Sequence, residues 1–257
     1  EDFIENQLVE GQLDRTGGLA PKTVIDLLAI VKSTIGYAQY KGFPVICNLS
    51  RLSIKRKDKE KRVLPHAERE SLIGILMEDM DSFKFGVFLA LYTGIRIGEL
   101  CALQWKDIDF ARATLKVRKT IQRIQNIDRQ AVSKTKIVIS EPKSKCSIRE
   151  IPLSVSVMDI AQNFISYPES YVLTGTSRYI EPRTMQNHFK LYVKQSGISD
   201  ANFHALRHTF ATRCVEVGFE IKSLSEILGH ASVNITLNRY VHSSFELKRF
   251  NMSKLIF

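Results

Sequence analysis

The stretch GISDANFHALRHTFATRCVEVG, residues 197–218, combines a long helix signal with a cluster of basic side chains at the helix start. Four apolar residues recur at i, i+4, i+8 and i+11, namely Leu206, Phe210, Cys214 and Val217. This spacing predicts a stripe on one helix face that packs against a core. A buried helix with several basic groups in its first turn needs a reason beyond packing.

The first turn of this helix carries His204, Arg207 and His208. Because residues three apart lie on one helix face, His204 and Arg207 could point at one anion near the helix start, where the helix dipole favours negative charge. Taken alone, H-x-x-R also fits an arginine in a salt bridge beside a structural histidine. His208 follows His204 at a spacing that can hold zinc, but no third ligand is evident. We therefore expect no metal, and we interpret His208 as a core or supporting residue.

Two other segments add residues of the same kind. In TGIRIGEL, Arg96 stands at a helix start after a glycine turn, and Glu99 lies one turn further on, where it could hold the guanidinium. In LGHASVNITLNRYVH, His230 follows a glycine at a helix end, and Tyr240 lies ten residues later. Each segment alone is also compatible with ordinary packing.

Together these residue types fit phosphoryl transfer. Two arginines can bind a phosphodiester in a bidentate way and stabilise the charge that develops on its oxygens. A tyrosine hydroxyl can attack phosphorus and form a covalent phosphotyrosine, while a lysine protonates the leaving oxygen and histidines hold or move protons. With two arginines and a lysine present, the chemistry requires no metal, and no cofactor is implied.

The composition points to a polyanionic partner. The 257 residues carry a net charge of +10, and nucleic acid is the commonest partner of such a protein, although a basic surface could also serve solubility alone. No apolar run approaches the roughly 18 residues of a membrane span, and no signal peptide is evident, so we expect no membrane association. Four scattered cysteines fit a reducing cytosol, with Cys101 and Cys214 in core positions.

The pattern along the chain predicts a mainly α protein with a small antiparallel β-sheet, an α+β fold. A helix is expected at 21–42, and the stretch 51–62, with seven Lys/Arg and two acids, is either a solvated loop or a linker that crosses a DNA backbone. Further helices are expected near 66–79, 83–93, 97–104, 156–165, 183–196, 204–217, 220–228, 232–240 and 245–256. Three strands of one sheet are expected at 113–121, 136–142 and 146–153, with the turn EPKSKCS joining the last two.

Two further segments have a predicted role. Residues 122–135 are long for a loop and rich in Lys/Arg, so we expect a hairpin extension that touches DNA or a neighbouring subunit. The tail at 245–257 has too broad an apolar stripe for a helix alone in water. It docks either on its own domain or on a neighbouring subunit, and its closeness to Tyr240 would couple that docking to the position of the tyrosine.

The order of these motifs resembles the tyrosine recombinase family of the phage-integrase type. The matching elements are T-G-x-R-x-x-E-L, a turn lysine followed by R-x-I-P-L, H-A-L-R-H-T-F-A-T, and L-G-H with a tyrosine ten residues on. The hairpin EPKSKCSIREIPL and the start RTGGLAPKTV look most like integrases of conjugative transposons and temperate phages. The resemblance covers nearly the whole chain.

The resemblance implies a role for each matching residue. Arg96 and Arg207 would clamp the scissile phosphate, and His230 would hydrogen-bond to it. Tyr240 would be the nucleophile that becomes joined to the 3′ phosphate, and His204 would help to accept its proton. Glu99 would support the site from behind. Lys143 would be the general acid for the departing 5′ oxygen, although Lys145 in the same turn is a second candidate.

The resemblance also implies a domain plan and partners. Residues 1–54 would form a helical core-binding domain, incomplete at its N-terminus, 55–62 a basic linker, and 63–257 a catalytic domain with the tail helix 245–257. The two domains would form a C-shaped clamp around double-stranded DNA. Because the chain lacks an initiating Met, we expect it to be a fragment, and an arm-binding domain of the integrase type has no counterpart in it.

The function that the resemblance implies is site-specific recombination. The enzyme would need neither metal nor ATP, would assemble as a tetramer on paired DNA sites, and would integrate and excise a mobile element with an accessory directionality factor. Its expected location is the cytoplasm of a prokaryote, in association with the nucleoid. The alternatives are a type IB topoisomerase-like strand transferase, a non-catalytic DNA-binding regulator, and, disfavoured by the lack of an acidic cluster, a metal-dependent nuclease.

Overall fold

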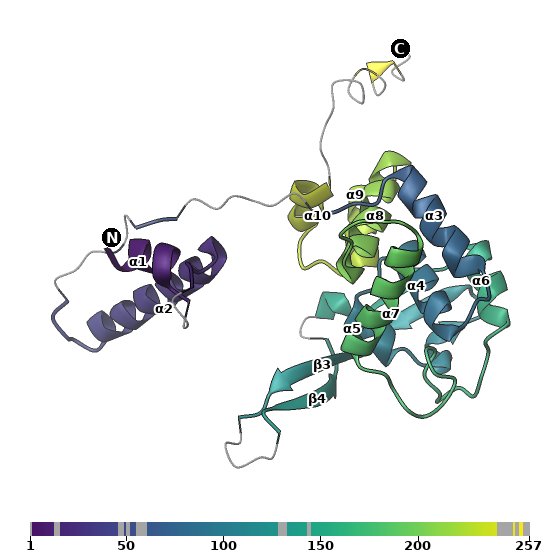
Figure 1. The fold of residues 1–257 in the computed structure, drawn as a ribbon, viewed down its shortest axis with the longest axis horizontal. Coiled ribbons are helices and arrows are strands. Elements are labelled where there is room, and N and C mark those ends of the chain that lie inside the picture. Colours follow the sequence, from purple (N-terminus) through teal and green to yellow (C-terminus); the bar gives the residue numbers. More distant parts are fainter. Residues whose placement is uncertain are drawn as a thin grey trace. The chain divides into compact units, whose positions relative to one another are not determined.

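The chain divides into two compact units, residues 1–60 and residues 61–257 (Figure 1). The computed structural model describes residues 2–12, 16–45, 49, 52–54, 61–127, 133–142, 145–240, 249 and 252–253. The division falls inside the stretch 55–62 that the sequence predicts as a linker. The expected tail helix at 245–257 lies almost wholly outside the described residues.

The smaller unit contains the helices α1 (Asp2–Glu10) and α2 (Pro21–Tyr40). Proline suits the first position of α2, because a residue there has no helical partner for a backbone N–H. Val24 and Leu28 are the buried residues of this helix, and the backbone N–H of Leu19 donates to the carbonyl of Gln7 at 2.8 Å. The sequence predicted α2 but not α1, which is short and has no buried residue to mark a core-facing stripe.

The larger unit is mainly helical. Its helices are α3 (His66–Met77), α4 (Ser82–Thr93), α5 (Ile97–Ala102), α6 (Val155–Gln162), α7 (Pro182–Gln195), α8 (Phe203–Glu216), α9 (Ile221–Leu228) and α10 (Val233–Tyr240), with 3₁₀ turns η1 (Trp105–Asp107) and η2 (Lys145–Ser147). All the helices predicted between 66 and 240 are present, with ends that differ by three residues or fewer. Among the described residues, no helix has both the length and the apolar character needed to cross a membrane.

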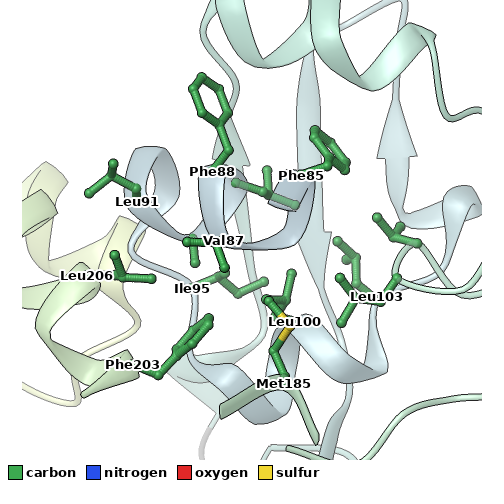
Figure 2. Packing of buried hydrophobic residues seen from close by; sticks show 14 of the residues in the cluster. Phe85, Val87, Phe88, Leu91, Ile95, Leu100, Leu103, Met185, Phe203 and Leu206 are labelled. Carbon is green, nitrogen blue, oxygen red and sulfur yellow. The ribbon is translucent and has the colours of Figure 1, made fainter. Parts of the chain in front are cut away.

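Helix α4 is the centre of the core. Eight of its residues are buried, so it is covered by side chains on all sides rather than on one face. Figure 2 shows its Phe85, Val87 and Leu91 among side chains from other elements, including Met185 and Phe203. The carboxylate of Asp81 caps the start of α4, and Gly94 ends it in the left-handed conformation.

Helix α8 confirms most of the predicted core stripe. Leu206 and Cys214 are buried and Phe210 is half-buried, but Val217 is 53% exposed, so its assignment to the stripe was wrong. Val217 stands at the C-cap, after the last residue of α8. Cys101 is buried as well, which confirms both predicted core cysteines.

The strands form two sheets, and the prediction of one three-stranded sheet with a hairpin at 136–153 was wrong. One sheet has the order β1 (Ile108–Asp109), β2 (Thr114–Val117), β5 (Arg149–Pro152), and the other pairs β3 (Thr120–Gln125) with β4 (Thr135–Ser140). The predicted strand 113–121 therefore breaks at residues 118–119, and β4 pairs with β3 rather than with β5. Alternation in a sequence identifies strands but not their partners.

The strands β3 and β4 form the hairpin extension that the sequence predicts for 122–135. Their register runs from Thr120 opposite Ser140 to Gln125 opposite Thr135, and the hairpin extends away from the body of the larger unit (Figure 1). An ion pair from Arg123 to Glu181 braces it, with N···O distances of 2.7 and 3.1 Å. Contact of this hairpin with DNA or with a neighbouring subunit stays a prediction.

Gly94→Ala should destabilise the larger unit by about 2 kcal/mol or more, because Gly94 has φ +64° and a Cβ there would stand 2.6 Å from the ring of Phe210. Gly74→Ala is the matched control. A Cβ at Gly74, inside α3, meets nothing within 4 Å, so this change should leave stability equal or raise it by about 0.5–1 kcal/mol. Urea unfolding of both variants measures the difference, and equal midpoints would contradict the strain at Gly94.

Candidate active site

The carboxyl end of α9 gathers three arginines from distant parts of the chain. Successive carbonyls each accept a hydrogen bond from a different guanidinium: Ile227 from Arg149 (2.5 Å), Leu228 from Arg207 (2.6 Å) and Gly229 from Arg96 (3.3 Å). The last carbonyls of a helix have no partner within the helix, and that end carries partial negative charge. The helix end therefore compensates part of the positive charge gathered around it.

Arg96 and Arg149 share one carboxylate. Nη1 of Arg96 donates to Oε1 of Glu99 at 2.8 Å, and Arg149 donates to both oxygens of Glu99, at 3.1 and 2.8 Å. Burial raises the pKa of Glu99, but the hydrogen bond and charge of Arg149 and the charge of Arg96 outweigh it, so the pKa lies below its ordinary value. Glu99 is thus ionised, and one negative charge faces two positive ones.

The exposure of the two arginines differs. The side chain of Arg149 is 5% exposed, whereas that of Arg96 is 37% exposed. The buried Arg149 therefore neutralises the charge of Glu99. The guanidinium of Arg96 is partly exposed to solvent and can bind an anion from outside the protein.

Arg207 is buried in helix α8 and is held by carbonyls instead of acids. It donates to the carbonyl of Gly94 at 2.8 Å as well as to that of Leu228. Burial, followed by the charges of Arg96 and Arg149, lowers the pKa of Arg207 to about 9. The guanidinium is still protonated at neutral pH, and a bound anion would stabilise it further.

His230 is positioned by the glycine that ends α9. Gly229 has φ +64°, and the chain then turns so that Nδ1 of His230 lies 2.8 Å from Oγ1 of Thr236. Within the described part of the chain, the buried Nε2 of His230 has no hydrogen-bond partner. Burial, and then the positive charge of Arg207, lowers the pKa of His230 to about 3. The ring is therefore neutral and has one nitrogen to offer to a ligand.

Tyr240, the last residue of α10, is 5% exposed and packs among residues of α8 and α9. Its hydroxyl is 2.9 Å from Nδ1 of His208, and its ring is parallel to that of His230, with centroids 6.3 Å apart. Burial raises the pKa of Tyr240, although Arg207 and Arg239 oppose the shift. The phenol therefore keeps its proton in the free protein.

His204 lines a pocket to which Arg207 of this cluster also contributes. The pocket is lined by side chains that include Arg183, Gln186, Lys190 and Arg207. Although His204 is partly exposed, desolvation and then the charge of Arg207 lower its pKa to about 4. Its ring meets that of His208 edge to face, with centroids 4.6 Å apart.

The structure brings together most of the residues singled out in the sequence. Hydrogen bonds and ring contacts connect the described members of the set: Arg96, Glu99, His204, Arg207, His230 and Tyr240. Lys143 lies outside the described residues, and of Lys145 only the backbone, in η2, is described. Their assignment as general acid stays a prediction.

Sequence reasoning missed two contacts. Arg149 is the arginine of R-x-I-P-L, and its position beside the lysine turn gave no sign of the buried carboxylate that it binds. His208 was interpreted as a core or supporting residue; it is buried, and it also holds the hydroxyl of Tyr240. Among the described residues, no three His, Cys, Asp or Glu side chains come close enough to form a metal site.

The comparisons with known proteins agree with the resemblance seen in the motifs. Residues 61–246 match the model of the phage integrase family, and the chain belongs to that family. A XerC-like tyrosine recombinase of Caldanaerobacter subterraneus is 33% identical over 171 residues, which cover 60% of this chain and 44% of the relative. The transposase from transposon Tn916 of Enterococcus faecalis is 27% identical over 221 residues, which cover 76% of this chain and 52% of the relative.

A solved structure extends the likeness to the fold. The integrase of transposon Tn1549, in complex with a circular intermediate DNA, has a TM-score of 0.71 and 25% identity, over 93% of this chain and 81% of that one. The fold class predicted from the sequence is confirmed, as is the resemblance to integrases of conjugative transposons. The chain spans only about half the length of the two curated relatives.

Glu99→Gln should destabilise the chain by about 3 kcal/mol at neutral pH, because it leaves Arg149 buried without a counter-charge. The pKa of Glu99 is lowered in the folded state, so its stabilisation is fully present above the unfolded pKa of about 4.3 and is lost as the pH falls through the folded value. The stability difference between wild type and variant should therefore stay constant from about pH 7 down to about pH 4.3 and shrink as the pH falls further, to about 3.

Urea unfolding across this pH range measures the effect. The control is Glu216→Gln, which removes an ion pair to Arg213 in which both side chains are more than half exposed and should cost about 0–1 kcal/mol. If the difference in unfolding free energy between wild type and Glu99→Gln stays constant down to about pH 3, Glu99 is not an ionised carboxylate in the folded protein.

Proposed function

We propose that this chain is a site-specific DNA recombinase of the integrase type. It would cut and rejoin DNA strands through a covalent 3′-phosphotyrosine intermediate and so integrate and excise a mobile element. The observation that carries the proposal is the convergence of Arg96, Arg207, His230 and the buried Tyr240 at the end of α9. The names of the similar proteins, a tyrosine recombinase and transposon enzymes, support the same reaction.

The charges of the site suit a phosphodiester. Arg149 compensates the carboxylate of Glu99, which leaves Arg96 and Arg207 as net positive charge with no further acid among their described partners. Two arginines can bind the two free oxygens of a phosphate, and their attraction grows as the transition state gains charge. His230 would donate from Nε2 to the same phosphate, since its Nδ1 is engaged by Thr236.

The reaction divides into balanced bond changes. The oxygen of Tyr240 forms a bond to phosphorus while the bond from phosphorus to the 5′ oxygen breaks. The 5′ oxygen takes a proton from Lys143, and the tyrosine gives its own proton to a neutral histidine of the site. Because the phosphotyrosine ester replaces one phosphodiester bond with another, the strand can be rejoined without ATP.

Double-stranded DNA is the proposed partner. The Tn1549 integrase was solved in complex with DNA, and a lambda integrase was solved as a tetramer on a Holliday junction. We propose that this chain likewise assembles on DNA as a tetramer during synapsis, with an accessory directionality factor, in the cytoplasm of a prokaryote and in association with the nucleoid.

Three simple experiments separate this function from its alternatives. A DNA adduct that resists denaturant distinguishes an enzyme from a regulator. Activity in excess EDTA distinguishes it from a metal-dependent nuclease. A requirement for paired sites distinguishes a recombinase from a type IB topoisomerase.

Tyr240→Phe should abolish the covalent adduct and leave DNA binding nearly unchanged, because one buried hydroxyl contributes little to a basic interface. Suicide substrates made from the ends of the mobile element that carries the gene trap the adduct, and gel shifts measure binding. Adduct formation by the Phe variant would identify a different nucleophile, and Tyr192 and Tyr179 would be tested next.

Lys143→Ala should slow cleavage by about 10²–10⁴-fold, since it removes the general acid. A substrate with a 5′-bridging phosphorothiolate should restore most of the rate, because the sulfur leaves without protonation. Lys145→Ala is the matched variant in the same turn and should respond little to the sulfur substrate. If the sulfur substrate rescues Lys145→Ala and not Lys143→Ala, the general acid is Lys145.

A further inference from the structure

The buried hydroxyl of Tyr240 has a defined hydrogen-bond partner, and this partner is not His204. Nδ1 of His208 lies 2.9 Å from the phenolic oxygen, and both residues are at least 94% buried. His204 lies one helical turn before His208 in α8, and its ring contacts that of His208. His208 therefore contacts both His204 and the hydroxyl of Tyr240.

The charges around His208 and Tyr240 determine which of the two residues donates this hydrogen bond. Burial, then His204, Lys61, Arg239 and Arg207, lowers the pKa of His208 to about 3, so its imidazole is neutral and has one acceptor nitrogen. The other side chains that interact with the hydroxyl, Arg207 and Arg239, can only donate. The phenolic O–H consequently donates to Nδ1 of His208, and the hydrogen of the imidazole is on Nε2.

This inference rests on the proposed function. We propose that His208 is the catalytic proton acceptor for Tyr240: as the phenolic oxygen bonds to phosphorus, its proton moves to Nδ1 of His208, and the imidazole becomes an imidazolium. The same proton returns to the tyrosine oxygen when the strand is rejoined, so the cycle consumes no proton. His204, facing the pocket, would then act on the phosphate side rather than on the nucleophile.

The positive surroundings of His208 oppose this transfer until DNA is bound. Burial disfavours an imidazolium at His208 most strongly, and the nearby charges, of which Arg207 is one, disfavour it further. A phosphodiester on Arg96 and Arg207 brings negative charge to the same place, and the transition state adds more. Proton transfer is therefore favourable only when the scissile phosphate is in position.

The test uses His208→Asn, whose short amide keeps a hydrogen-bonding atom near the position of Nδ1 but cannot take a proton. Adduct formation on the element-end suicide substrates should slow by about 10²–10³-fold, with unfolding midpoint and DNA affinity near those of wild type. The control is His188→Asn, a histidine stacked on Phe83 outside the site, which should cleave within about twofold of wild type. If His208→Asn does not fold, His208→Gln replaces it.

A more acidic phenol separates proton transfer from positioning. With a difluorotyrosine at position 240 the phenol ionises without a strong acceptor. His208→Asn should then form the adduct less than about tenfold more slowly than the same protein with His208. A deficit that persists with the acidic phenol, or cleavage by His208→Asn close to the wild-type rate, overturns the inference while leaving the recombinase function intact. Absence of any adduct with the wild-type chain would instead overturn the proposed function and this inference with it.

Discussion

The end of helix α9 is the constraint on which the site depends. Its last carbonyls bind Arg149 from a strand, Arg207 from a core helix and Arg96 from a helix start, so one helix terminus sets the relative positions of three distant segments. The carbonyls supply partial negative charge without the full charge of an acid. The arginines are thereby oriented and remain available to a stronger anion.

The balance of charge around this point explains the protonation states of the site. Among the described residues, Glu99 is the one acid paired with Arg96 and Arg149, and Arg149 is buried against it. Desolvation, and after it the surplus positive charge, lowers the pKa values of His204, His208 and His230, and the three rings are neutral before an anion arrives. Neutral rings can accept or donate at a phosphate, whereas three imidazolium ions would repel the arginines.

Local signals predicted the helices well and the strand pairing poorly. Helices depend on neighbours three and four residues away, and caps such as Asp81 and Gly94 are visible in the sequence. Strand partners depend on the three-dimensional path of the chain, so the break after β2 and the separate β3–β4 hairpin were not evident. Helix α1 was missed although Ile4 and Leu8 stand four residues apart; it has only nine residues, too few for a clear helical period.

The sequence by itself determined the family, the fold class and most of the residues that gather at the end of α9, because motif spacing, helical periodicity and residue chemistry can be read along the chain. Only the tertiary structure decided that Arg149 binds Glu99, that β4 pairs with β3, and that His208 rather than His204 meets the hydroxyl of Tyr240. These are contacts between segments far apart in the chain. They depend on the packing of α8, α9 and α10 and on the cost of burying a charge or a hydroxyl without a partner, which no local pattern records.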